Sequence, residues 1–129
     1  MRIFLLSLLL LGGCSAAPGG RAITGIDWRA SNINGVPVAP DTLVTLRFAG
    51  KGVSGSSGCN SYSGNYELMS KEGIRFGALS NTEKACAPQV MEQEQRFLSI
   101  MKSVEGYSFY SDGSFSLISP DGRAIRFRR

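Results

Sequence analysis

The sequence contains no histidine among its 129 residues and only three cysteines. Histidine is the usual base for serine and cysteine nucleophiles and the commonest metal ligand, so its absence excludes Ser-His-Asp and Cys-His catalysis. Two of the cysteines, Cys59 and Cys86, fall in the body of the chain, too few and too far apart for a cysteine-rich zinc site. We therefore expect no metal site, no cofactor and no enzymatic activity.

The chain also lacks a large net charge and a long apolar run. The net charge of +4 is small, and no motif of aromatic and basic residues accompanies it, which argues against nucleic acid as a partner. The apolar stretch from Ile3 to Leu11 is far shorter than the roughly 20 residues of a membrane-spanning helix. Its length, and Arg2 before it, are typical of a secretory signal peptide.

Small residues and a cysteine end this apolar stretch. Leu11-Gly12-Gly13-Cys14 resembles the lipobox of bacterial lipoproteins, in which the cysteine receives a diacylglyceryl group and cleavage occurs just before it. We predict a signal peptide over residues 1–13, a lipidated cysteine with a flexible tether over 14–23, and one domain over 24–129. Ser15 favours the outer membrane, with the domain facing the periplasm. The alternative is an ordinary signal peptide with an incidental cysteine.

Glycines and turn signals organise the domain. Sixteen glycines and short alternating segments, beginning with a predicted strand over 24–30, favour a turn-rich β architecture. Asp112-Gly113 and Asp121-Gly122 separate alternating runs, which predicts a three-stranded meander. The stretch 54–66 predicts a strand that bulges and resumes, and a helix runs from Pro88 to Lys102. The expected fold class is α+β: a strongly curved antiparallel β-sheet or open barrel with one α-helix packed across it.

One charged residue falls on the apolar side of the predicted helix. At 100° per residue, five side chains form one apolar arc: Val90, Met91, Phe97, Leu98 and Met101. Glu94 lies near the middle of this arc. A buried carboxylate is costly unless it is hydrogen-bonded or paired. We predict a structural acceptor for backbone N–H groups or a tyrosine, with a functional acid as the alternative.

Cys59 and Cys86 would occupy an oxidising compartment after export, where paired cysteines usually form a bond. A disulfide would stabilise the domain by roughly 3.5 kcal/mol on a chain-entropy estimate. The alternative is two buried thiols packed near one another.

Three arginines lie close together at the end of the chain: Arg126, Arg128 and Arg129. Such charge usually belongs to a solvated face or protects an edge strand. Near a membrane it could also attract anionic lipid or another polyanion.

The stretch from Gly52 to Tyr66, with Gly58-Cys59-Asn60 at its centre, is similar to the signature of the META domain family, which includes the HslJ-like lipoproteins. Supporting matches follow in the same order: Trp28, Phe76-Gly77, Thr82-Glu83-Lys84-Ala85-Cys86, Met91-Glu92-Gln93-Glu94, Phe97-Leu98, Asp121-Gly122 and Phe127. The resemblance implies a small α+β domain in exported, often lipid-anchored proteins. It also implies links to stress response, novobiocin tolerance and motility, without catalytic residues to carry over.

We therefore expect a non-catalytic, membrane-anchored envelope lipoprotein, monomeric, that acts as a binding or accessory module in envelope stress response or antibiotic tolerance. Its partners would be the membrane, through the lipid on Cys14, and an envelope protein or polymer. The candidate interaction surface comprises Ser54, Ser56, Ser57, Asn60, Tyr62 and Tyr66. A polymer binder should have a groove lined by the tyrosines and arginines. The alternative, a periplasmic protease inhibitor or chaperone-like factor, should present residues 54–57 as a protruding loop.

Overall fold

The structure is a computed structural model that describes residues 22–129, so Cys14 and the rest of the predicted leader lie outside the described residues. Within this range the elements follow in the order β1 (Trp28–Ile33), β2 (Val36–Pro37), β3 (Thr45–Ala49), β4 (Gly52–Ser56), β5 (Ser61–Met69), β6 (Gly73–Phe76), β7 (Ser80–Asn81), α1 (Pro88–Ser103), β8 (Gly106–Phe109), β9 (Phe115–Ile118) and β10 (Ala124–Arg128).

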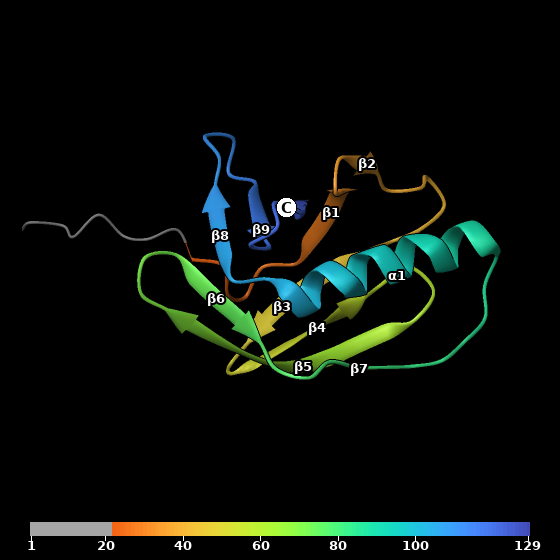
Figure 1. The fold of residues 1–129 in the computed structure, drawn as a ribbon, viewed down its shortest axis with the longest axis horizontal. Coiled ribbons are helices and arrows are strands. Elements are labelled where there is room, and N and C mark those ends of the chain that lie inside the picture. Colours follow the sequence, from red (N-terminus) through yellow and green to blue (C-terminus); the bar gives the residue numbers. More distant parts are fainter. Residues whose placement is uncertain (1–21) are drawn as a thin grey trace, which may run out of the picture.

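Eight of these strands form a closed antiparallel barrel. The strand order is β1-β3-β4-β5-β6-β8-β9-β10, and β10 pairs again with β1 to close the ring. The two short strands β2 and β7 are additions paired with β1 and β5. Figure 1 shows α1 running across the strands. The α+β class with one helix across a curved sheet is thus confirmed. The ring is closed because β1, which pairs with β3 on one side, pairs with β10 on the other.

Backbone pairing around the barrel is shortest between β6 and β8, and we call this junction the thin seam. Gly73 opposite Gly106 is the residue pair that joins them. Two backbone hydrogen bonds flank this pair, from Ile74 to the carbonyl of Glu105 (3.1 Å) and from Tyr107 to that of Glu72 (3.0 Å). The helix packs against β6, β10 and β1. Its apolar face therefore fills the barrel beside this thin seam.

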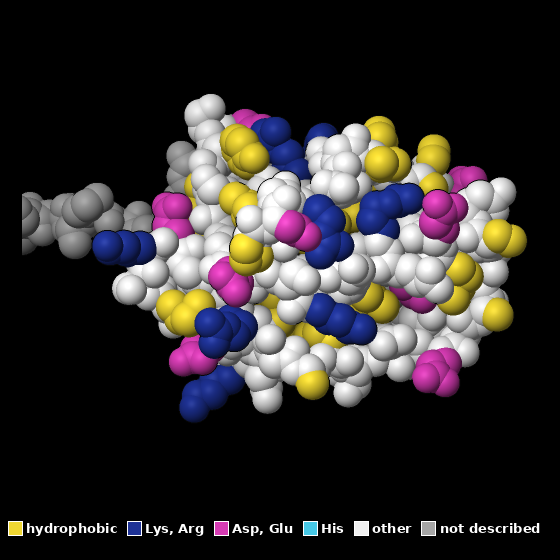
Figure 2. Space-filling model, viewed as in Figure 1, with side chains coloured by type: hydrophobic (Ala, Val, Ile, Leu, Met, Phe, Trp, Pro, Cys, Tyr) yellow, Lys and Arg dark blue, Asp and Glu magenta, His cyan; other side chains and the backbone are white. Residues whose placement is uncertain are grey.

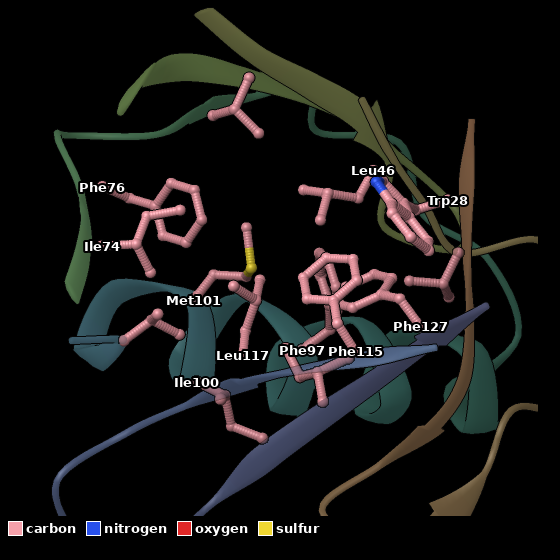
Figure 3. Packing of buried hydrophobic residues seen from close by; sticks show 14 of the residues in the cluster. Trp28, Leu46, Ile74, Phe76, Phe97, Ile100, Met101, Phe115, Leu117 and Phe127 are labelled. Atoms are coloured by element: carbon pink, nitrogen blue, oxygen red, sulfur yellow. The ribbon is translucent and has the colours of Figure 1, made fainter. Parts of the chain in front are cut away.

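The core is a set of large side chains from opposite walls of the barrel and from α1. Phe97, Ile100 and Met101 of the helix are all fully buried. Figure 3 shows Phe97 and Met101 lying between Ile74 and Phe76 on one side and Trp28 and Leu46 on the other. The Trp28 ring meets Phe115 edge-on with 4.5 Å between centroids. Such edge-to-face pairs add stability beyond the apolar area that they bury.

Helix α1 has one apolar face and one polar face. It ends one residue later than predicted, at Ser103, and carries Lys102 in its last turn, where a cation suits the helix dipole. Among residues 22–129, no helix has the length and apolar character needed to cross a membrane.

Both predicted Asp-Gly hairpins are confirmed. Gly113 joins β8 to β9 with φ +87°, and Gly122 joins β9 to β10 with φ +89°. Left-handed backbone of this kind favours glycine because it has no Cβ. The three-stranded C-terminal meander is therefore present as predicted.

Two local predictions were wrong. The stretch 54–66 does not bulge within one strand but reverses direction, so that β4 and β5 pair as a hairpin with Ser56 opposite Ser61. The first strand begins at Trp28 instead of residue 24 and runs to Ile33, with an irregularity after Ala30. The β4–β5 turn contains no Asn-Gly or Asp-Gly pair that would have predicted it. Side-chain hydrogen bonds stabilise this turn instead.

Residue Trp28 anchors the start of the domain. It is fully buried, and its Nε1–H donates to the carbonyl of Ile23 at 2.9 Å. Ile23, at the end of the predicted tether, is itself only 4% exposed. The fold therefore already includes Ile23.

We expect Trp28→Phe to lower the free energy of unfolding by about 1–3 kcal/mol, because it leaves a cavity and an unpaired carbonyl. Urea unfolding followed by circular dichroism measures this change. Val36→Ala, at a half-exposed position, is the control and should change the free energy by less than about 0.5 kcal/mol. Equal stability of the Trp28 variant and the wild type would contradict the anchoring role.

Candidate functional site

A buried carboxylate lies where the β4–β5 turn meets α1. Glu94 is 3% exposed. Its Oε1 accepts hydrogen bonds from the Ser57 hydroxyl (2.6 Å) and the Asn60 backbone N–H (2.7 Å), and its Oε2 accepts one from Asn60 Nδ2 (2.7 Å). Three donors therefore converge on this one carboxylate.

Asn60 uses its remaining groups on the segment that precedes α1. Its Oδ1 accepts from the Lys84 backbone N–H (2.6 Å) and the Thr82 hydroxyl (2.9 Å), and its Nδ2 also donates to the Lys84 carbonyl at 3.1 Å. We call Ser57, Asn60, Thr82 and Glu94 the Asn60 cluster. It joins three pieces of chain: the β4–β5 turn, the extended segment before the helix, and the helix itself.

The electrostatics of Glu94 follow from these contacts. Burial opposes ionisation and is the largest single influence on its pKa, but the hydrogen bonds from Ser57 and Asn60 together outweigh it. The pKa of Glu94 therefore lies below its ordinary value. The carboxylate is held ionised as an acceptor.

A disulfide joins the same pieces covalently. Cys59, in the β4–β5 turn, is bonded to Cys86, two residues before α1, with 6.0 Å between their Cα atoms. Cys59 directly precedes Asn60 in the chain. The covalent bond and the Asn60 cluster thus act on one turn.

Two glycines make room for this turn. Gly58 has φ +120°, which L side chains rarely adopt. A Cβ at Gly55 would overlap the carbonyl of Thr45 and lie 2.9 Å from the Tyr62 hydroxyl. That hydroxyl donates to the same Thr45 carbonyl at 2.6 Å, and burial raises the pKa of Tyr62 far above its usual range. The glycines of this stretch therefore serve close packing.

The structure divides the six residues of the predicted interaction surface. Ser57, Asn60 and Tyr62 are buried, at 0%, 3% and 2% exposure, and their side chains are hydrogen-bonded inside the domain. They cannot contact a partner, so their assignment to an interaction surface is corrected. Ser54 is exposed, and Ser56 and Tyr66 are partly exposed. The alternation of β5 turns Tyr62 inward.

Tyr66 lines a shallow groove of about 600 Å³ together with Phe76, Lys51 and Arg75. Its ring packs edge-on against Phe48, and its hydroxyl donates to the Gly50 carbonyl at 3.0 Å. The groove combines two aromatic rings, two cations and the acid Glu67, and Tyr62 is not part of it.

A second groove, of about 880 Å³, contains three basic side chains. Arg126, Arg128 and Arg129 line it together with Ser31 and Asn32. Figure 2 shows one face of the molecule, on which basic and acidic side chains lie next to one another. Ion pairs among the described residues include Arg96 with Glu92 (3.8 Å) and Arg123 with Asp121 (2.8 Å).

Gln93 and Thr82 were not among the predicted site residues. Gln93, 5% exposed, accepts from the Ala39 N–H and donates to Thr42, both at 2.8 Å, and so ties the β2–β3 connection to α1. Its place beside Glu94 on the apolar side of the helix is a signal that could have found it. In the part of the chain that the structure describes, no group of three or more cysteine or acidic residues could hold a metal ion.

We expect Glu94→Gln to lower the free energy of unfolding by about 1–3 kcal/mol at pH 7, because an amide N–H would face groups that are themselves donors. Since folding lowers the pKa of Glu94, its stabilising contribution is complete above the ordinary value of 4.5 and disappears as the pH falls through the folded value. Urea titrations at a series of pH values should therefore show the two proteins converging below about pH 4.5.

Glu92→Gln is the matched control, since Glu92 lies on the same helix with a 77% exposed side chain. It should change the free energy of unfolding by less than about 0.5 kcal/mol at every pH. A gap between wild type and Glu94→Gln that stays constant down to pH 3 would contradict the role of the ionised carboxylate.

The double variant Cys59→Ser with Cys86→Ser should lose roughly 3.5 kcal/mol of stability, because the bond closes a loop with a sequence separation of 27. Urea midpoints with and without reductant measure the loss. Reductant should lower the midpoint of the wild type and leave that of the double variant unchanged. A wild type indifferent to reductant would disprove the stabilising bond.

Two solved structures share this architecture. An NMR structure of a protein from Burkholderia xenovorans is 24% identical, with a TM-score of 0.69 and 83% of each chain covered. A second NMR structure is 23% identical, with a TM-score of 0.64, and the match covers 79% of this chain and 86% of the other. At these identities the likeness shows the fold alone.

The family is identified from the sequence. None of the curated proteins matches it. The META domain matches residues 21–129, which is most of the chain and includes the whole barrel and helix. The chain therefore belongs to the META domain family.

Proposed function

We propose that this protein is a lipid-anchored envelope protein whose META domain is a non-catalytic binding or accessory module at the outer membrane. The binding role is inferred from one observation, namely that the polar side chains inside the fold and those on its surface are used differently. The polar side chains that could do chemistry are engaged inside the fold, whereas two open grooves carry charged or aromatic side chains on the surface.

Two features support the envelope location. The sequence Leu11-Gly12-Gly13-Cys14 has the form of a lipidation site. The Cys59–Cys86 disulfide suits an oxidising compartment such as the periplasm. Acyl chains contribute about 0.8 kcal/mol for each buried methylene, so several chains on Cys14 would make the attachment effectively permanent.

The chemistry around Glu94 argues against catalysis. Glu94 and Asn60 line a small hollow of about 350 Å³, the arrangement that a hydrolase would need. However, the carboxylate already accepts three hydrogen bonds, and its pKa is lowered. A general acid or base works best with a pKa near the working pH. The site is therefore better suited to holding the fold than to moving protons.

The inhibitor alternative loses the loop on which it depended. Residues 54–56 belong to β4 and all pair with β5, and Ser54 also pairs with Arg47 of β3. A strand inside the barrel cannot insert into a protease cleft as a protruding loop does. No other feature favours the inhibitor over a binding module.

The location is tested by the intact mass of the protein recovered from native membranes. We expect the mass of residues 14–129 plus three acyl chains, with two cysteines alkylated only after reduction. Cys14→Ser should abolish acylation and release the protein from the membrane fraction, whereas the Cys59→Ser, Cys86→Ser double variant should keep both. An unacylated wild-type protein in the soluble fraction would overturn the proposal.

The role is tested in cells. The META domain family is linked to novobiocin tolerance, so a strain without this protein should tolerate less novobiocin. Wild-type protein should restore tolerance and Cys14→Ser should not, if the module acts at the membrane. Full restoration by an equally abundant Cys14→Ser protein would separate the role from the anchor and overturn the anchored module.

A further inference from the structure

The groove with three arginines lies between two hairpins on the outside of the barrel. The β8–β9 turn contributes Asp112, Gly113 and Ser114 to its lining, and the β1–β2 hairpin contributes Gly35 from its turn and Pro37 from β2. Figure 1 shows these hairpins projecting on the same side of the molecule with the chain end at β10 between them. We call this hollow the arginine groove.

The arginine groove continues along the outer face of β1 and β10. A neighbouring hollow of about 480 Å³ shares Ser31, Arg128 and Arg129 with it and adds Arg29. Arg29 and Arg128 are direct cross-strand partners, and both are exposed. Their side chains therefore leave the sheet on the same face, one beside the other.

Like charges directly opposite each other destabilise a sheet. Thr45, the partner of Arg29 on its other side, carries no charge to offset the pair. The salt bridges found within residues 22–129 involve other arginines: Arg47 with Asp27, Arg96 with Glu92, Arg123 with Asp121, and Arg126 with Asp112. Within the described residues, Arg29, Arg128 and Arg129 thus form no salt bridge with an acidic side chain where β1 meets β10.

Arg126, the remaining arginine that lines the arginine groove, is held in place at its side. Arg126 lies 3.9 Å over the Tyr110 ring, donates from Nε and Nη2 to the Ser114 hydroxyl, and contacts Asp112 at 3.3 Å. Asp112 is the one acid that lines the arginine groove, and it sits at the Arg126 end. The end with Arg128 and Arg129 is therefore the more positive.

We propose that the arginine groove binds a phosphate-bearing anion, held between Arg128 and Arg129 with Arg29 beside them. Guanidinium groups match phosphate because they present paired N–H donors in a plane. The amide of Asn32, on β1, supplies a further neutral donor along the groove. The two opposed guanidinium groups of Arg29 and Arg128 repel each other in the free protein. A bound phosphate would remove this repulsion, so the same pair of charges would favour binding.

This inference names the ligand class for the binding role proposed above and rests on that role. It does not need the lipid anchor, because all of its residues belong to the barrel. The two proposals can therefore fail separately. The protein could bind phosphate without being acylated, or it could be acylated without binding phosphate, and the experiments distinguish these results.

The test is calorimetric titration of the purified full chain, in an uncharged detergent, with inorganic pyrophosphate at low salt. The Arg128→Gln, Arg129→Gln double variant should bind about tenfold or more weakly, because it loses two charge-assisted contacts. The matched control is Lys71→Gln with Lys102→Gln, two exposed residues outside both grooves, which removes the same charge and should change the affinity less than about twofold. No saturable binding by the wild type, or equal weakening in both variants, would overturn the proposal.

Arg29→Gln separates binding from structure. Without ligand it should unfold at the same or a higher urea concentration than the wild type, since a repulsion is removed, while its affinity for pyrophosphate falls. Loss of stability together with unchanged affinity would show that Arg29 is only a structural residue and would overturn its place in the site.

The source of the phosphate is resolved with vesicles. The Cys14→Ser chain is sedimented with vesicles of phosphatidylcholine alone or with phosphatidylglycerol added. Binding to the anionic vesicles that pyrophosphate displaces identifies a lipid headgroup, and binding of pyrophosphate without vesicle binding identifies a soluble phosphorylated ligand. Vesicle binding that the Arg128→Gln, Arg129→Gln pair leaves intact would overturn the groove as the site.

Discussion

The interaction on which the rest of the structure depends is the acceptance of three hydrogen bonds by the buried carboxylate of Glu94. The donors belong to Ser57 and Asn60, so the carboxylate fixes the β4–β5 turn onto α1. Asn60 then holds the segment before the helix through Lys84. A buried charge is tolerated because its donors replace water, and every buried side-chain nitrogen or oxygen in the described range has a partner. The turn, the disulfide and the helix position all follow from this arrangement.

This constraint also explains how a barrel with one thin seam remains closed. Strands β6 and β8 meet through Gly73 and Gly106 and two flanking hydrogen bonds. The helix held by Glu94 presents Phe97, Ile100 and Met101 to the interior, all fully buried. Packing against β6 and β10 at once, it supplies apolar contacts where backbone pairing is sparse. The buried acid and the aromatic core therefore support each other.

The parts of the fold that local chemistry specifies could be predicted from the sequence. Asp-Gly turns, Pro88 at the start of the helix and the position of Glu94 on its apolar side each carry their own signal. The β4–β5 turn could not be predicted, because its donors and acceptors come from residues more than 30 positions apart. The same distance hid the burial of Asn60, which looks like a surface residue in a serine-rich stretch. The arginine groove needed the register of β1 with β10, which no short-range pattern contains.

The stretch by which the family is recognised is thus occupied with folding. Its glycines allow close approach, its asparagine and serine bind Glu94, and its cysteine is bonded to Cys86. Residues used in this way identify an architecture. A ligand of the kind proposed above would instead contact side chains on the outer face of the barrel. On β1 and β10 those side chains include Arg29 opposite Arg128, a pairing that costs stability in the free protein. If an anion binds there as proposed, neutralising this pair would add to its binding free energy, because the repulsion that the free protein keeps on its surface would be removed.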